Sequence, residues 1–383
     1  MRKVAVLIIS ISILMGGMGT AGFGWDFQRL TNNSGVSMNP VVAMLSNNIH
    51  IFWQDDIFGN DEIFYKRSWT TGADFPVFQR ISNNDGESTE PAAAVRIPNG
   101  QIVHLVWEDD SYGNTEIFYK RSTDYGGGWT FRRFSNNSGS SGSPSVAAVG
   151  GDVHVFWNDS SFGSYEIFYK RSTDDGDSWN FGRLSSNSGS SFSPWVAASS
   201  SGVHVVWTDY SYGNWEVFYK RSTDRGASWS FQRLSNNPGS SYRPRISVSG
   251  TNVFVVWEDD TFGGNQEIFF KKSTDNGSTW SFQRLTNNSG MSRWPVVAAE
   301  GSNVHVVWYD TVFIVWEVCY KRSTDNGNSW SFERLTDNSG ASQVPAVAAY
   351  DGNIHAVWQD TTFNSNYEIF YKRGPNFRPV GGR

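Results

Sequence analysis

Apolar and polar residues follow one another in short runs along this chain, and the same order of runs returns about every 50 residues. One unit reads P-x-V-A, then V-H-V-V-W-x-D, then E-I-F-Y-K-R-S, then W-x-F-x-R-L-S-N-N-S-G. Runs rich in β-branched and aromatic residues, separated by Gly, Asn, Asp and Ser, predict β-strands joined by turns. No segment has the period of an amphipathic helix. Each unit therefore predicts a four-stranded antiparallel sheet.

The tripeptide W-x-D occurs once in each unit, so its copies give the number of units. It begins at Trp53, Trp107, Trp157, Trp207, Trp257, Trp308 and Trp358. Residues 25–30 match a fourth strand without the preceding three, and residues 368–373 match a third strand without a fourth. These two fragments complete one blade, and joining them removes two exposed sheet edges. The sequence predicts an all-β fold, a seven-bladed β-propeller closed by its N-terminal strand.

Composition narrows the partners. Aromatic residues make up 16% of the chain and there are 38 glycines, which fits many short strands and tight turns. The net charge is −6, with acidic and basic residues interspersed, so nothing indicates a nucleic-acid partner. The single cysteine, Cys319, excludes an internal disulfide. We expect a monomer without cofactor or bound metal.

The N-terminus has the layout of a secretory signal peptide. Arg2 and Lys3 precede an apolar run over residues 4–15, and small residues follow through Ala21. The run is short for a membrane span, although an uncleaved membrane anchor is the alternative. We predict a signal peptide over residues 1–21 and one propeller over 22–383, with a short tail at 374–383. This predicts a secreted, periplasmic or cell-surface protein without a membrane span after cleavage.

The turn between the third and fourth strands carries a second motif, S-T-D-x-G-x-x-W. Copies lie at Ser122–Trp129, Ser172–Trp179, Ser222–Trp229, Ser273–Trp280 and Ser323–Trp330, with a degenerate copy at Ser68–Phe75. The motif resembles the Asp-box, or BNR repeat, of the sialidase-like propellers. The Asp can accept backbone N–H groups, the Gly can adopt a positive φ, and the Trp can pack beneath the turn. The resemblance implies a structural turn on the face opposite the active site.

Residues that recur in every unit indicate scaffold. The histidines share one position of the second strand: His50, His104, His154, His204, His305 and His355. The fifth unit has Phe254 there, so we expect half-buried strand residues and not metal ligands or general bases.

Three charged positions recur seven times: the Asp of W-x-D, the Glu that begins the third strand and the Arg that ends the fourth. In an antiparallel sheet all three lie at one edge, which predicts an Asp–Arg–Glu ion network. Seven equivalent polar sites for a sugar or for calcium are the alternative, but the oxygen spacing does not match an EF-hand loop.

A specific site should break the repeat, and the two variable residues of S-x-x-P do so just before the first strand. The candidate ligand-binding residues at or beside these positions are Trp195, Tyr242, Arg243, Arg245, Arg293, Trp294 and Glu90. All but Glu90 belong to blades four to six. Aromatic rings beside guanidinium groups suit a sugar ring or an acidic glycan. An ordinary solvated rim is the alternative.

The resemblance to sialidases can be tested at one tripeptide. That family has an Arg-Ile-Pro whose Arg binds the substrate carboxylate from the start of an innermost strand. Arg96-Ile97-Pro98 matches the letters but falls in the hairpin after the first strand, on the Asp-box face. Arg293-Trp294-Pro295 has the matching register. The family's other channel arginines, its Asp acid/base and its Tyr–Glu nucleophile pair cannot be assigned.

Three functions follow from these patterns. The leading hypothesis is a secreted binding module that recognises glycans or another extracellular polymer through the channel face. Glu90 is the one non-recurring carboxylate on the approaches to the first strands, which leaves a catalytic carboxylate pair unassigned. A sialidase-like glycoside hydrolase and a propeller for protein interaction or structure are the alternatives, because fold does not decide function.

Overall fold

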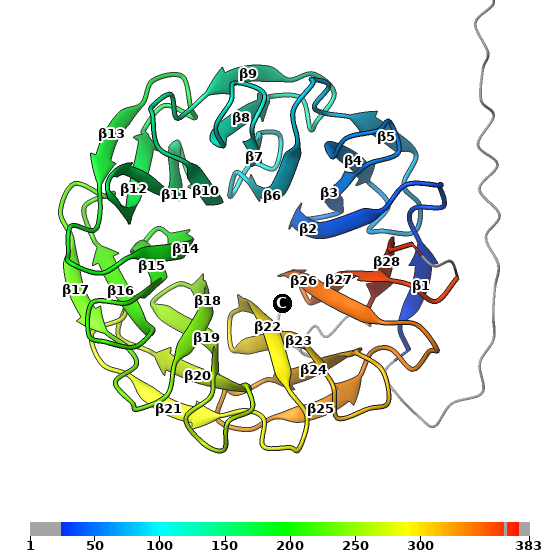
Figure 1. Ribbon diagram of the computed structural model, residues 1–383. Helices are drawn as coiled ribbons and strands as arrows, with labels where there is room; N and C mark the ends of the chain where they lie inside the picture. Colours follow the sequence, from blue (N-terminus) through cyan, green and yellow to red (C-terminus); the bar gives the residue numbers. More distant parts are fainter. Residues whose placement is uncertain (1–23, 364–365, 375–383) are drawn as a thin grey trace, which may run out of the picture.

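Seven four-stranded sheets stand around a central channel in the computed structural model, which describes residues 24–363 and 366–374 (Figure 1). The predicted all-β, seven-bladed propeller is confirmed. The predicted signal peptide and the tail beyond residue 374 lie outside the described residues. Within the described part of the chain, no helix is long and apolar enough to cross a membrane.

The first four blades follow the chain, each from its innermost to its outermost strand. Blade one contains β2 (Ser37–Leu45), β3 (Asn48–Asp55), β4 (Glu62–Ser68) and β5 (Val77–Arg80). Blade two contains β6 (Ser88–Val95), β7 (Val103–Asp109), β8 (Glu116–Ser122) and β9 (Thr130–Arg133). Blade three contains β10 (Ser141–Val149), β11 (Asp152–Phe162), β12 (Ser164–Ser172) and β13 (Asn180–Arg183). Blade four contains β14 (Ser191–Ser199), β15 (Gly202–Asp209), β16 (Glu216–Ser222) and β17 (Ser230–Arg233).

The last three blades complete the ring. Blade five contains β18 (Ser241–Ser249), β19 (Asn252–Asp259), β20 (Glu267–Ser273) and β21 (Ser281–Arg284). Blade six contains β22 (Ser292–Glu300), β23 (Asn303–Asp310), β24 (Glu317–Ser323) and β25 (Ser331–Arg334). Blade seven contains β26 (Ser342–Tyr350), β27 (Asn353–Asp360), β28 (Glu368–Arg373) and, from the other end of the chain, β1 (Asp26–Arg29).

Closure occurs as the two incomplete units predict. β1 pairs antiparallel with β28, with Phe27 opposite Lys372. Arg29 Nη2 lies 3.0 Å from Glu368 Oε1. Trp25 packs edge-on against Tyr320 of blade six, with ring centroids 5.5 Å apart. The N-terminal strand thus completes blade seven and also fastens it to its neighbour.

The core lies between the blades, because each sheet packs on the next. Phe52 and Tyr65 of blade one lie in one cluster with Leu105 and Trp107 of blade two. The second strands are therefore covered on both faces, which explains their nearly continuous apolar sequence.

Burial corrects the expectation for the histidines, which are fully buried and not half-buried. His50 Nδ1 lies 2.7 Å from Tyr65 Oη, and the same pairing with the third strand recurs at four other histidines. Burial lowers the pKa of His50 to about 3. In blade five Phe254 takes the place of the histidine and Phe270 takes the place of the tyrosine. The position therefore serves packing.

The predicted ion pair between Glu and Arg is confirmed, whereas the predicted participation of Asp in the same network is wrong. Arg80 Nη2 lies 2.6 Å from the buried Glu62 Oε1, and equivalent pairs occur in blades two, three, four, five and seven. Asp55 Oδ2 instead accepts hydrogen bonds from Ser37 Oγ at 2.5 Å and Asn33 Nδ2 at 2.9 Å. The Asp ends the second strand, beside the first strand, whereas the Arg lies on the fourth.

The Asp-box turns tie each blade to the one before it. Ser222 Oγ accepts the Gly226 N–H at 2.7 Å, and Asp224 Oδ1 accepts the Ser228 N–H at 2.8 Å. Glycine is required in this turn because φ is positive and a Cβ would collide with the tyrosine of the preceding blade: a Cβ on Gly277 would lie only 1.9 Å from Tyr219 Oη. Trp280 then packs edge-on against that same tyrosine.

The Arg-Ile-Pro string lies with these turns. Arg96 Nε lies 3.1 Å from Asp175 Oδ1, in the Asp-box turn of blade three. It also donates to the Gly150 carbonyl at 2.7 Å. Arg96 is therefore on the Asp-box face, as its register predicts.

Candidate functional site: a pocket at the channel mouth

A β-bulge in each innermost strand builds the channel mouth. Met38 pairs with Gln54, and the next pair is Val41 with Phe52. The S-x-x-P motif thus lies inside the first strand, and its prediction just before the strand is corrected. Proline has no N–H to donate to the neighbouring strand and therefore fits a β-bulge. The bulge in turn directs the side chains next to the proline toward the channel mouth.

The second variable residue of every bulge has a left-handed backbone conformation. These residues have φ between 49° and 52°: Asn39, Glu90, Ser143, Ser193, Arg243, Trp294 and Val344. The bulge also aims the N–H of this residue at the preceding blade, where the Trp294 N–H donates to Glu258 Oε1 at 2.7 Å. Glu258 is the middle residue of its W-x-D, so these positions also line the mouth.

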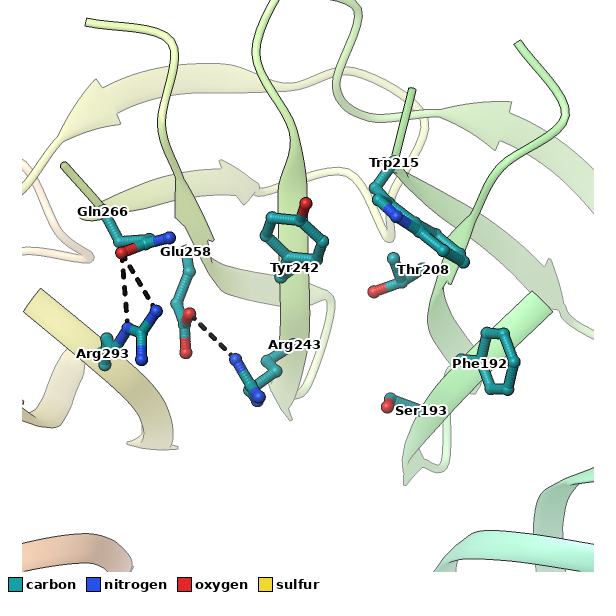
Figure 2. A pocket seen from close by; sticks show the side chains of 9 residues that line it. All are labelled: Phe192, Ser193, Thr208, Trp215, Tyr242, Arg243, Glu258, Gln266 and Arg293. Atoms are coloured by element: carbon teal, nitrogen blue, oxygen red, sulfur yellow. Dashed lines mark hydrogen bonds and ion pairs between the residues drawn. The ribbon is translucent and has the colours of Figure 1, made fainter. Parts of the chain in front are cut away.

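A pocket of about 440 Å³ opens on this face between blades four, five and six (Figure 2). It is lined by Phe192, Ser193, Thr208, Trp215, Tyr242, Arg243, Glu258, Gln266 and Arg293. These residues come from four positions of the repeat: the two variable residues of the bulge, the middle of W-x-D, and the residue before the third-strand Glu. Three of the predicted residues, Tyr242, Arg243 and Arg293, meet here.

Aromatic rings form one wall of the pocket. Phe192 lies between Tyr165 and Trp215, with ring centroids 4.6 and 5.8 Å away. Trp215 in turn lies 6.4 Å from Tyr242. Phe192, Trp215 and Tyr242 line the pocket and are half-buried, so part of each ring remains open to a ligand. Rings of this kind suit the apolar faces of sugars.

Charged groups form the other end, shown at the left of Figure 2. Arg243 Nη1 lies 3.2 Å from Glu258 Oε2. Arg293 donates from Nε and Nη2 to Gln266 Oε1, at 3.3 and 3.2 Å. Within the described residues, no carboxylate lies within ion-pair distance of Arg293. Two guanidinium groups against one carboxylate leave this end of the pocket positive.

The other predicted residues support the wall or lie elsewhere. The Arg243 guanidinium lies 4.8 Å from the Trp294 ring. Arg245 lies 4.2 Å from the Trp195 ring, and burial, with a contribution from Arg243, lowers the pKa of Arg245 to about 10. Trp195, Arg245 and Trp294 thus do not line the pocket themselves.

Glu90 lies in blade two, does not line the pocket, and stands beside a second carboxyl group. Burial and the neighbouring Glu90 raise the pKa of Glu108 to about 8. In blade one, burial and Glu87 raise the pKa of Asp61 to about 6, and Gln54 Nε2 donates to Asp61 Oδ2 at 2.9 Å. The mouth is therefore acidic at blades one and two and basic at blades five and six.

Six lining residues were not among the predicted candidates: Phe192 and Ser193, which are the variable pair of S-x-x-P in blade four, and Thr208, Trp215, Glu258 and Gln266. A signal was present, because the middle of W-x-D and the residue before the third-strand Glu vary between repeats as widely as S-x-x-P does. Among the described residues, no group of three His, Cys, Asp or Glu side chains could hold a metal ion.

Comparisons identify the fold. No family model and no curated protein matches the chain. Solved structures do: a PL25 ulvan lyase has a TM-score of 0.64 and 11% identity, covering 88% of this chain and 94% of its own. The phage phi92 endosialidase has a TM-score of 0.58 and 9% identity, covering 94% and 70%. A mutant Trypanosoma rangeli sialidase has a TM-score of 0.52 and 13% identity, covering 92% and 60%. At these identities the likeness shows a sialidase-like β-propeller fold.

Proposed function

We propose that this propeller is a binding module for an acidic extracellular glycan, held in the pocket between blades four and six. The observation that carries the proposal is the junction of an aromatic wall with Arg293, a guanidinium group bound to an amide oxygen and not to a carboxylate. The fold of the solved neighbours, named as sialidases and polysaccharide lyases, supports a carbohydrate ligand by analogy only.

The two ends of the pocket would bind different parts of the ligand. Sugar rings would pack on Phe192, Trp215 and Tyr242. A carboxylate or sulfate would accept hydrogen bonds from Arg293 and displace the weaker contact with Gln266, because charge-assisted bonds to guanidinium are stronger than neutral ones. Arg243 already has a carboxylate partner in Glu258, so Arg293 provides most of the selectivity for acidic ligands.

A sialidase-like hydrolase is the second candidate, favoured by one observation. Glu108, with its raised pKa, could stay protonated at neutral pH, as a general acid must. A nucleophile is harder to find. Tyr309 lies near Glu258 and Arg293, but burial and Glu258 raise its pKa to about 12. A phenol that holds its proton is a poor nucleophile, and this favours binding over hydrolysis.

A glycan array with the mature protein tests the proposal. We expect binding to uronic-acid, sialylated or sulfated glycans and no turnover of a fluorogenic sialoside. Trp215→Ala should weaken binding by about tenfold, since a stacked ring contributes on the order of 1 kcal/mol or more. Turnover that requires Glu108 would favour the hydrolase. Absence of any glycan binding would favour a protein-interaction propeller.

A further inference from the structure

The junctions between neighbouring blades repeat one arrangement at the channel mouth. The N–H of the second variable bulge residue faces the middle residue of W-x-D in the preceding blade, as the Ser193 N–H does at 3.3 Å from Asn158 Oδ1. This contact recurs at four other junctions among the described residues. The first variable bulge residue lies beside the residue that precedes the third-strand Glu of the preceding blade, as Phe192 lies beside Tyr165. We call these four residues of one junction a slot and name each slot by its two blades.

The pocket extends over three consecutive slots (Figure 2). Its lining residues come from slot 3/4 (Phe192, Ser193), slot 4/5 (Thr208, Trp215, Tyr242, Arg243) and slot 5/6 (Glu258, Gln266, Arg293). No residue of slot 6/7 lines it. There the Trp316 ring packs edge-on against Tyr309, with ring centroids 4.8 Å apart. From Arg293 the pocket therefore extends in one direction around the mouth, toward blade three.

Slot 3/4 continues the aromatic wall beyond the pocket. The Tyr165 ring centroid lies 4.6 Å from that of Phe192, which in turn lies 5.8 Å from that of Trp215. Tyr165 is half-buried, so part of its ring is open to a ligand as well. Aromatic rings in two successive slots offer stacking surfaces to more than one sugar unit. The wall therefore suits a chain of sugars better than a single one.

Charge changes along this run of slots. In the three slots of the pocket, Arg293 is the guanidinium group with no carboxylate within ion-pair distance among the described residues, since Arg243 is paired with Glu258. Slot 3/4 has no charged side chain, because it consists of Tyr165, Asn158, Phe192 and Ser193. The place for an acidic group is thus at one end of the run, and the remaining slots suit uncharged sugar units.

The next slot along, slot 2/3, is acidic. Its Glu108 is half-buried, and glycine at position 142 leaves that carboxyl group uncovered, because a Cβ there would lie 3.0 Å from Glu108 Oε1. Burial and then Glu90 raise the pKa of Glu108. Arg245 interacts with Glu90 and balances at most one of these two carboxyl groups. A further anionic group is therefore unfavourable in slot 2/3, for the same reason that Glu90 raises the pKa of Glu108.

We propose that the ligand is an oligosaccharide of at least three units with a single acidic unit, which binds in slot 5/6 while the uncharged units follow the aromatic wall to Tyr165. This inference rests on the proposed function, because it takes Arg293 as the group that binds the acid. It adds the length of the chain, its direction around the mouth and its charge distribution. A chain that is acidic on every unit would instead bring carboxylates to uncharged slot 3/4 and, with a fourth unit, to acidic slot 2/3.

Calorimetric titration with two probes of different length tests the assignment of Tyr165. The probes are three xylose units capped with one glucuronic acid, and one xylose unit capped in the same way. The parent should bind the longer probe more tightly. Tyr165→Ala should weaken binding of the longer probe by about tenfold, because a stacked ring is lost, and leave the shorter probe unaffected. Tyr165→Phe, which keeps the ring, should bind both probes like the parent.

Tyr367→Ala is the matched control. Tyr367 occupies the equivalent position of the repeat in slot 7/1 and is also half-buried, so this variant should bind both probes like the parent. Tetragalacturonate, which has the length of the longer probe but an acid on every unit, tests the charge distribution. It should bind the parent more weakly than the longer probe. Glu90→Gln combined with Glu108→Gln should strengthen its binding by about threefold or more and leave the longer probe unaffected.

Three results would overturn the inference and leave the proposed function standing. The first is equal affinity for the long and the short probe, with both affinities lost in Arg293→Lys. The second is selective loss of the longer probe in Tyr367→Ala and not in Tyr165→Ala, which would run the chain through slot 6/7. The third is tighter binding of tetragalacturonate than of the longer probe. Failure of every acidic probe to bind would overturn the proposed function and this inference together.

Discussion

Residues that occupy the same position in different blades show what that position requires. The His–Tyr pair of five blades is a Phe–Phe pair in blade five, and both pairs are buried. Burial leaves the histidines neutral, because an imidazolium would lose its hydration. The His–Tyr pair thus contributes packing near neutral pH, but at acid pH the buried histidine lowers the free energy of unfolding.

A double substitution tests this cost. Burial, with Arg221 nearby, lowers the pKa of His204 to about 4 from 6.5. Between these values the unfolded chain binds a proton that the folded chain does not, so the free energy of unfolding falls as the pH falls, by up to about 1.4 kcal/mol per pH unit. His204→Phe with Tyr219→Phe, which copies blade five, removes this term. Its melting temperature should fall less than that of the parent between pH 7 and pH 5; parallel curves would contradict the prediction.

Backbone strain at the bulge gives a second residue-scale prediction. Val344 has φ of 49°, a conformation costly for a β-branched residue, whereas blade one has Asn39 there. Val344→Asn should raise the free energy of unfolding by about 1 kcal/mol, since asparagine tolerates the left-handed region. Asn39→Val should lower it, as chemical denaturation would measure. Stability changes of the opposite sign would show that side-chain packing outweighs the strain.

At the scale of elements, the Asp-box turn acts as a clamp between blades. Asp224 is itself exposed, yet its carboxylate orders the turn that positions Trp229 against Phe156 and Tyr169 of blade three. Hydrogen bonds from Ser228, Ser222 and Ala227 hold the pKa of the Asp224 carboxyl well below its usual range.

Asp224→Ala should therefore lower the melting temperature without changing ligand selectivity, because the turn lies on the face opposite the pocket. Thermal unfolding and the glycan array measure the two effects separately. Asp224→Asn, which keeps one acceptor oxygen, should lie between the parent and Asp224→Ala. Lost binding at an unchanged melting temperature would place the functional face on the Asp-box side.

At the scale of the whole molecule, closure of the ring depends on four residues from the far end of the chain, β1. Deletion of Trp25–Leu30 exposes the edge of β28 and removes the Arg29–Glu368 pair and the Trp25–Tyr320 contact. The deletion should sharply lower the melting temperature and promote association between chains. A deletion variant as stable as the parent would show that blade seven does not need its fourth strand.

The whole fold was predictable because it repeats. Arg29 and Glu368 are far apart in sequence, but each fills a gap that seven copies of the unit make visible. The site was only partly predictable. Variation in S-x-x-P identified Tyr242, Arg243 and Arg293, whereas Trp215 and Gln266 reach the pocket from loops whose position depends on the path of the whole blade.

Side-chain direction limited the rest of the site prediction. The bulge places the residue before proline in the left-handed region and decides which of its neighbours face the pocket, so Trp294 lies beside Arg243 while Arg245 packs on Trp195. Sequence spacing does not contain this information. It also does not show that Glu108 and Glu258, at equivalent positions, meet opposite partners: another carboxyl group in one case and an arginine in the other.

Calorimetric titration of one acidic glycan from the array into a matched pair of variants tests the central claim most directly. Arg293→Lys keeps the charge but loses the planar fork that holds a carboxylate or sulfate with two bonds, and affinity should fall about tenfold or more. Arg96→Lys, in the Arg-Ile-Pro string on the opposite face, should bind like the parent. Unchanged affinity in Arg293→Lys together with lost affinity in Arg96→Lys would contradict the account and place the ligand on the Asp-box face.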